Sequence, residues 1–137
     1  MTITKRFLDK KGACSDGVEL FLKQKKRSID GITGIKLLIK LDKLDYANWL
    51  IVRLMGYRMY VSYGIYAAEQ VIANFEKKYP NDDRLGKAIE AAKKCLKSPT
   101  KKNKKAADSA AHSAHSAARK KMQIKILKYG IKLLKEA

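Results

Sequence analysis

The sequence contains few of the residues that interrupt helices or staple small folds. Its 137 residues include only two prolines, eight glycines and two cysteines. Long helices are therefore favoured, because proline cannot continue a helix and glycine weakens one. Cys14 and Cys95 lie far apart and are too few for the disulfide framework of a small secreted protein. We expect both to be free thiols packed in the core, as in a protein of the reducing cytoplasm.

The sequence also lacks long apolar runs. No stretch approaches the roughly 18 consecutive apolar residues that can cross a membrane, and residues 46–72, the most apolar part, are interrupted by polar side chains. Residues 1–11 carry charges and have no apolar segment typical of a signal peptide. We therefore expect a cytoplasmic protein with no membrane association.

Positive charge is in large excess. The net charge is +18, and residues 101–137 carry 11 of the 31 basic side chains but only two of the 13 acidic ones. Such a field attracts nucleic acid, anionic nucleotides or an acidic protein. Most of the basic residues are lysines, which also keep proteins soluble, so a purely compositional origin of the charge is the alternative.

Apolar residues recur at spacings of three and four, which predicts an all-α fold. A chain of this length fits one domain, residues 1–137. We expect a single helical bundle of about five to seven helices. The expected helices lie around residues 3–11, 17–22, 35–41, 46–55, 57–78 and 84–97, and in a long Ala/Lys-rich segment after residue 105. Residues 35–41 could instead form a strand, because short apolar runs fit both, and we favour a helix.

Two short sequence signals mark helix ends. Asp16 and Glu19 have the spacing of a capping box. Pro80 excludes Tyr79 from a helix, and Asp82 or Asp83 can cap the helix that follows. We assign structural roles to the residues of this second signal and to the tryptophan of the preceding apolar helix. They are Trp49, Tyr79, Pro80, Asp83 and Arg84.

The last segment carries an apolar stripe along one helical face. The stripe consists of Ala107, Ala111, Ala114, Ala118, Met122, Ile126, Tyr129 and Leu133. A helix of about 30 residues would be about 45 Å long, which exceeds the expected width of the domain. We expect this helix to break, with Gly130 as one candidate position, to protrude, or to pack on a second copy in a homodimer.

Basic residues form two candidate anion-binding groups. Arg53 and Arg58 interrupt the most apolar part of the chain, where an arginine needs a carboxylate or a phosphate partner. They predict either ion pairs within the fold, with Glu69, Asp83 or Glu90, or a pocket for an anionic ligand. The second group could contact phosphates or an acidic partner, with a solvated face as the alternative. It consists of Lys101, Lys102, Lys104, Lys105, Arg119, Lys120, Lys121 and Lys125.

No pattern predicts catalysis. Asp108, His112 and His115 share one helical face but do not complete a metal site. No cysteine is placed beside a histidine by the sequence, and no glycine-rich loop precedes a lysine. We predict a protein that is not an enzyme and that has no cofactor and no metal.

Several segments, in order along most of the chain, carry a resemblance to a known family. They are Gly12-Ala13-Cys14 with Gly17-Val18-Glu19 and Phe21, Asn48-Trp49-Leu50 with Arg53, Tyr66-Ala67-Ala68-Glu69, residues 75–84, residues 87–92 and the Ala-rich segment after residue 105. With them the chain resembles the Imm-5-like immunity proteins, small helical proteins of bacteria and phages. The resemblance implies a helical protein that binds and neutralises another protein.

The charge sets this chain apart from many immunity proteins. Those that block nucleases are often acidic and mimic nucleic acid, whereas this chain carries +18. Our leading hypothesis is therefore a non-enzymatic protein of immunity or phage counter-defence type that occludes an acidic partner in the cytoplasm of a bacterial host. One alternative is a nucleic-acid-binding protein that uses the basic C-terminal helix. The other is a nucleotide-sequestering protein with Arg53 and Arg58 in its pocket.

Overall fold

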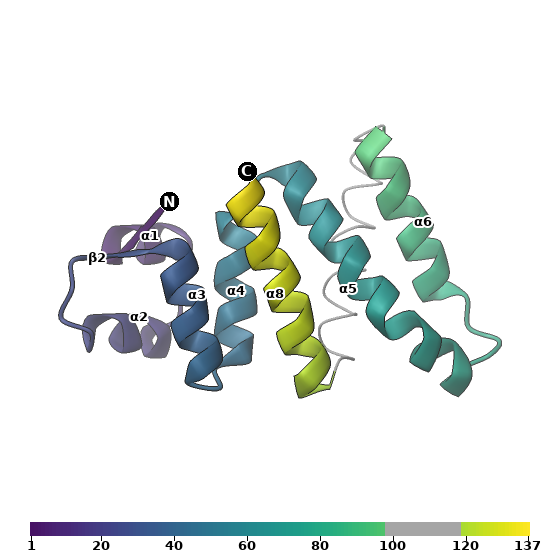
Figure 1. Ribbon diagram of the computed structural model, residues 1–137, viewed down its shortest axis with the longest axis horizontal. Coiled ribbons are helices and arrows are strands. Elements are labelled where there is room, and N and C mark those ends of the chain that lie inside the picture. The colour runs from purple at the N-terminus through teal and green to yellow at the C-terminus, as the bar shows by residue number, and fades with distance from the viewer. Residues whose placement is uncertain (98–118) are drawn as a thin grey trace. The chain divides into compact units, whose positions relative to one another are not determined.

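The computed structural model describes residues 1–97 and 119–137 (Figure 1). Over these residues it contains seven helices and two short strands, and 76% of it is helical. This confirms the mainly α-helical fold with five to seven helices. The chain divides into two compact units, Met1–Leu54 and Met55–Ala137, which are described separately.

The first unit contains a small antiparallel sheet that the sequence pattern did not predict. β1 (Thr2–Thr4) pairs with β2 (Ser28–Asp30), and Ile3 lies opposite Ile29. Both isoleucines are buried, so the pair is part of the core of this unit. The assignment of Ile3 to a first helix is therefore wrong. A three-residue strand is too short to show alternation, and its partner is distant in sequence.

Two helices connect these strands. α1 (Lys5–Lys10) begins at Thr4, whose hydroxyl accepts a hydrogen bond from Phe7 N at 3.1 Å. Gly12, with φ of 74°, follows its end in the left-handed conformation that favours glycine. α2 (Ser15–Leu22) has Cys14 as its N-cap, without a side-chain cap bond. The predicted capping box at Asp16 is wrong, because the helix already begins before that residue.

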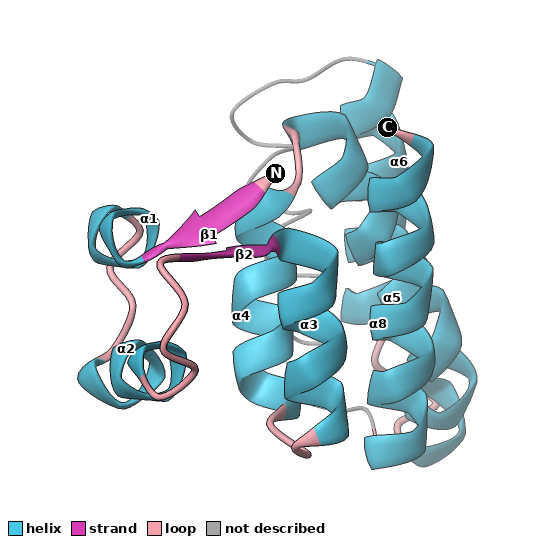
Figure 2. Ribbon diagram, turned by 60° about the vertical axis from the view of Figure 1, so that its left-hand side comes forward, coloured by secondary structure: helices cyan, strands magenta, loops and turns pink. Residues whose placement is uncertain are grey.

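α3 (Gly31–Lys40) and α4 (Leu44–Leu54) pack side by side (Figure 2). The helical reading of residues 35–41 is confirmed. Asp30 caps α3 by accepting a hydrogen bond from Thr33 N at 3.1 Å. Gly34 allows a close approach of the strand, because a Cβ there would lie only 2.9 Å from Ile3 Cδ1.

The second unit consists, in the described residues, of α5 (Tyr57–Lys78), α6 (Arg84–Lys97) and α8 (Lys120–Glu136). α5 packs against both of the others. On the α6 side, a core cluster contains Val61, Ile65, Ala92 and Cys95. The Tyr57 hydroxyl also hydrogen-bonds Cys95 Sγ. The bounds expected for both α5 and α6 are confirmed.

α5 and α8 run antiparallel. Tyr66 stacks on Tyr129 with ring centroids 3.9 Å apart, and Lys125 Nζ donates to Gln70 Oε1 at 2.9 Å. Residue numbers along the contact rise on α5, from 66 to 70, as they fall on α8, from 129 to 125. These contacts fix which ends of the two helices lie together.

Gly130, the candidate position for a break in the last helix, does not break it. Gly130 is buried within α8, and the helix instead begins at Lys120 after Arg119, whose ψ of 158° is extended. The buried face also differs from the predicted stripe, since it contains Ile126, Leu127, Gly130, Ile131 and Leu134. The Ala-rich part of the stripe, with Asp108, His112 and His115, lies outside the described residues.

The structure places the two cysteines differently. Both are free, as expected, but Cys14 is exposed and only Cys95 is buried. The prediction of a packed Cys14 is therefore wrong, because this residue precedes α2 rather than lying on its inner face.

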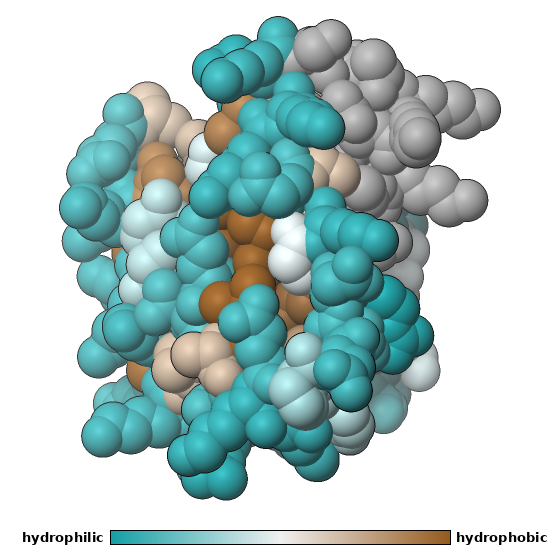
Figure 3. All heavy atoms as spheres, turned by 90° about the vertical axis from the view of Figure 1, so that its right-hand side faces the viewer, coloured by the Kyte–Doolittle hydropathy of each residue, from teal (hydrophilic) through white to brown (hydrophobic). Residues whose placement is uncertain are grey.

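Among the described residues, no helix is long and apolar enough to cross a membrane. Hydrophilic side chains surround a narrow apolar strip on the face drawn in Figure 3.

Candidate partner-binding groove

A large groove lies in the second unit, between the C-terminal half of α5 and the N-terminal half of α8. Its volume is about 1220 Å³. The described residues that line it are Val71, Asn74, Phe75, Lys77, Lys78, Tyr79, Arg119, Lys121, Met122, Ile124, Lys125 and Lys128. We call this feature the α5–α8 groove.

The antiparallel packing of α5 and α8 builds the groove. α5 stops where Pro80 follows Tyr79, whose N–H makes the last bond of the helix, to Phe75 O at 2.8 Å. α8 starts at Lys120, so its first turns lie beside this end of α5. The groove is thus made where one helix ends and the other begins.

The groove has an apolar floor and a basic rim. Phe75, Met122 and Ile124 are half-buried, whereas the cationic residues are exposed. Six of the 12 described lining residues are basic, and none of those 12 is acidic. The basic residues are Lys77, Lys78, Arg119, Lys121, Lys125 and Lys128.

The positive charge at the start of α8 opposes the helix dipole. A helix N-terminus carries a partial positive charge and is stabilised by acidic side chains. α8 instead has no acidic residue in its first turn, which contains Lys120 and Lys121, and its N-cap Arg119 makes no side-chain cap bond. An acidic group bound here would interact favourably with both the helix dipole and these basic side chains.

The C-terminal end of α5, on the other side of the groove, has a more ordinary arrangement of charge. Lys77 and Lys78 lie in the last turn of α5, where cations complement the partial negative charge of the carbonyls. Lys78 Nζ also lies 5.4 Å from the ring centroid of Tyr79, a cation–π contact. The exposed Tyr79 ring therefore forms part of the rim of the groove.

Three of the sequence-predicted binding residues meet in the groove. Arg119, Lys121 and Lys125 line it, and Lys120 belongs to the same turn of α8 without lining it. The predicted binding residues Lys101, Lys102, Lys104 and Lys105 lie outside the described residues.

Arg53 and Arg58 do not line the groove. Arg53 belongs to the first unit, where its guanidinium lies 4.0 Å from the centroid of the Trp49 ring and donates to Trp49 O at 2.9 Å. Arg58 is exposed and donates to Leu96 O at 3.4 Å, near the end of α6, where helix carbonyls lack a partner.

Two of the three carboxylates expected as arginine partners bind lysines. Glu69 pairs with Lys93 at 3.4 Å, and Asp83 pairs with Lys87 at 3.0 Å. Arg58 bonds a backbone carbonyl instead of a carboxylate, because it reaches the C-terminal end of α6 rather than an acidic side chain. The structure therefore does not bring the predicted arginine–carboxylate sets together around Arg58.

Asp82 and Arg84 form a network of hydrogen bonds in the turn between α5 and α6. Asp82, rather than Asp83, accepts the Arg84 backbone N–H at 3.0 Å and binds the Arg84 guanidinium at 2.6 Å. The side-chain bond to Arg84 is the main reason why the pKa of Asp82 lies below its ordinary value. Asp82 therefore organises the start of α6, a role that the sequence left open between two aspartates.

The sequence did not predict Lys77, Lys78 and Lys128 as members of the groove. Lys77 and Lys78 end a long helix before a proline, which by itself indicates only a helix terminus. Only the antiparallel contact between α5 and α8 brings these lysines near Lys125 and Lys128. A sequence signal for that contact would have been a covarying pair such as Gln70 and Lys125.

A family comparison covers the second unit. The family model described as Imm-5 like putative immunity protein matches residues 55–136, more than half of the chain. The match begins where the second unit begins and includes both helices of the groove. No curated protein and no solved structure matches the chain.

Proposed function

Because the chain belongs to the family of Imm-5 like immunity proteins, we propose that it neutralises a toxin protein by binding an acidic surface of that partner in the α5–α8 groove. The proposal assigns no catalysis to the chain, since the work of such a protein is occlusion. The observation that carries it is the combination of six cations, no described acidic lining residue and an apolar floor in one groove.

This combination fits a protein partner. Protein interfaces have an apolar centre and a polar rim, and the half-buried Phe75, Met122 and Ile124 provide such a centre. Exposed lysines around it would attract carboxylates over a distance and raise the association rate more than the final affinity. The favoured partner surface therefore carries carboxylates around one or two apolar side chains.

One observation favours a second candidate, a nucleic acid. The Tyr79 ring is 47% exposed on the rim and lies among lysines, which suits base stacking beside phosphate contacts. The apolar floor has no role in phosphate contact, so we rank this candidate second. The nucleotide-sequestering alternative has less support, because Arg53 and Arg58 do not line the groove.

Any neighbouring gene whose product arrests growth supplies a toxin, and co-expression with it tests the proposal. The variant K121E/K125E reverses two groove charges one helical turn apart, and K36E/K40E reverses two exposed lysines with the same spacing on α3. Both variants change the net charge equally. We expect the α8 variant to lose protection of growth and the α3 variant to keep it. Equal protection by the two variants would contradict the proposal.

Folding does not confound this comparison. A glutamate at position 121 is favoured by the helix dipole, and a glutamate at position 125 can accept a hydrogen bond from the Gln70 amide in place of the bond that Lys125 donates. K121E/K125E should therefore fold about as stably as the original protein. Circular dichroism of the purified variants checks this point. A folded α8 variant that no longer protects cells would locate the partner at the groove.

A further inference from the structure

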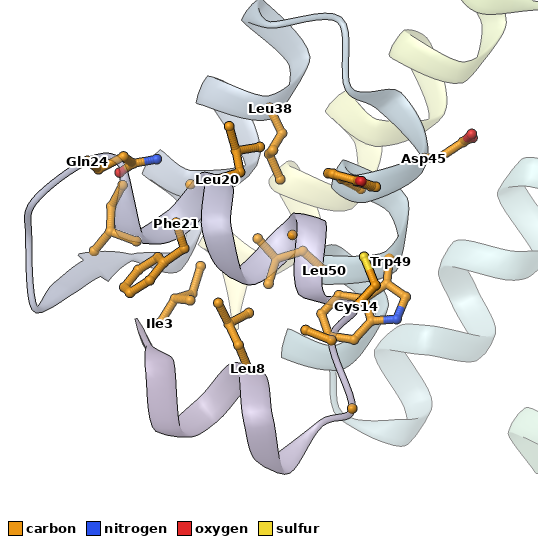
Figure 4. A pocket seen from close by; sticks show the side chains of 16 residues that line it. Ile3, Leu8, Cys14, Leu20, Phe21, Gln24, Leu38, Asp45, Trp49 and Leu50 are labelled. Carbon is orange, nitrogen blue, oxygen red and sulfur yellow. The ribbon is translucent and has the colours of Figure 1, made fainter.

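The first unit contains a second cavity, of about 340 Å³ (Figure 4). It is formed by β1, β2 and the four helices of this unit, and it lies outside residues 55–136, the part that matches the family. Its walls are aliphatic and aromatic. They include Leu8, Leu20, Phe21, Ile29, Leu38 and Leu50.

The charge of this cavity contrasts with that of the α5–α8 groove. None of its described lining residues is basic, although the chain has 31 lysines and arginines. The one charged residue of the lining is Asp45, and its carboxylate points away from the other labelled side chains in Figure 4. An anion or an acidic protein surface would find no cation here.

The few polar groups of the cavity lie on two sides, with Gln24 on the side opposite Cys14 and Trp49 in Figure 4. Cys14 and Trp49 lie side by side in Figure 4, and Tyr46 is part of the same lining. The neighbouring Cys14 side chain is the main reason why the pKa of Tyr46 is raised. The cavity thus combines an apolar body with a thiol, a hydroxyl, an indole and the Gln24 amide, all of them uncharged.

We propose that this cavity binds a small, uncharged and largely apolar molecule. Its volume falls at the lower end of the range of ligand sites, about 300 to 1,000 Å³. Water would bind poorly, because the apolar walls offer few hydrogen-bond partners. Protein interiors are otherwise close-packed, so an apolar occupant would recover contacts that the empty cavity lacks. The proposal does not depend on the function proposed for the groove.

N-phenylnaphthylamine, an uncharged fluorescent probe, tests the cavity directly. Trp49 is the only tryptophan of the chain and lines the cavity, so energy transfer from it reports a bound probe. We expect saturable binding. The anionic analogue, anilinonaphthalene sulfonate, should bind the same site at least about tenfold more weakly, because its sulfonate would have no cationic partner.

A blocked variant and a matched control locate the probe. A Cβ at Gly17 would lie 3.5 Å from Cys14 Sγ, an ordinary contact, so Gly17→Leu extends a side chain into the cavity. Gly86 lies in α6, and a Cβ there would meet nothing within 4 Å. Both changes replace a helical glycine by a better helix former. We expect Gly17→Leu to weaken probe binding at least about tenfold and Gly86→Leu to change it less than about twofold.

Alkylation of the unmodified protein gives a readout that needs no variant. Cys14 is exposed and Cys95 is buried, so N-ethylmaleimide should modify Cys14 first. Saturating N-phenylnaphthylamine should slow that reaction several-fold, as measured by mass spectrometry. An unchanged alkylation rate, absence of probe binding, or equal probe affinity in Gly17→Leu and Gly86→Leu would overturn the proposal.

Discussion

Truncation of two leucines in α8 distinguishes the observed helix face from the one that the sequence predicted. Leu127 is fully buried, whereas Leu133, a member of the predicted stripe, is half-buried. Leu127→Ala removes the equivalent of three methylene groups, worth about 2.4 kcal/mol at about 0.8 kcal/mol each. The cavity left behind raises the expected loss to about 3 to 4 kcal/mol. Leu133→Ala should cost about 1 kcal/mol, because part of its side chain already contacts solvent.

Urea unfolding followed by far-ultraviolet circular dichroism measures both losses. This signal reports helices of both units, whereas the only tryptophan belongs to the first. At a slope of about 2 kcal/mol per molar urea, Leu127→Ala should lower the midpoint by about 1.5 to 2 M and Leu133→Ala by about 0.5 M. An equal or larger loss for Leu133→Ala, with unchanged slopes, would show that the assigned face of α8 is wrong.

Three further predictions concern other contacts. Because the pKa of Asp82 is lowered in the folded protein, its contribution to stability is present above the ordinary carboxyl pKa and is lost as the pH falls through the folded value. The difference in urea midpoint between the original protein and Asp82→Asn should therefore shrink toward low pH, and a constant difference would contradict this. Tyr129→Leu should destabilise the protein by about 0.5 to 1.5 kcal/mol through loss of the Tyr66 stack, and the double change with Tyr66→Leu should be clearly less than additive. Cys14 should react with Ellman's reagent in the native protein and Cys95 only after denaturation, so simultaneous reaction would refute their assigned burial.

The sequence predicted helices best where their ends carry strong local signals. Gly56 precedes α5, and Pro80 follows it, so the bounds Tyr57–Lys78 could be read without tertiary information. Other boundaries depend on packing. The pairing of Ile3 with Ile29 and the closeness of Gly34 to Ile3 join distant parts of the first unit. No local pattern of three residues contains that information.

The candidate groove could be predicted only in part. The excess of positive charge near the C-terminus pointed to Arg119, Lys121 and Lys125, and these residues do line the groove. Lys77 and Lys78 join them because α5 and α8 run antiparallel, which is a property of tertiary packing. Arg53 and Arg58 were predicted to form ion pairs or an anion pocket because they interrupt an apolar segment. In the fold these arginines bond the backbone carbonyls of α4 and α6 respectively.

The central claim is that the α5–α8 groove captures an acidic toxin surface. The association rate constant with the toxin, measured by stopped flow at low and at physiological salt, tests it most directly. We expect K121E/K125E to lower the rate at least about tenfold at low salt and to weaken its salt dependence, because fewer cations remain to steer the partner. K36E/K40E should change the rate less than about twofold. Equal rates for these two variants, or a faster rate for K121E/K125E, would contradict the account.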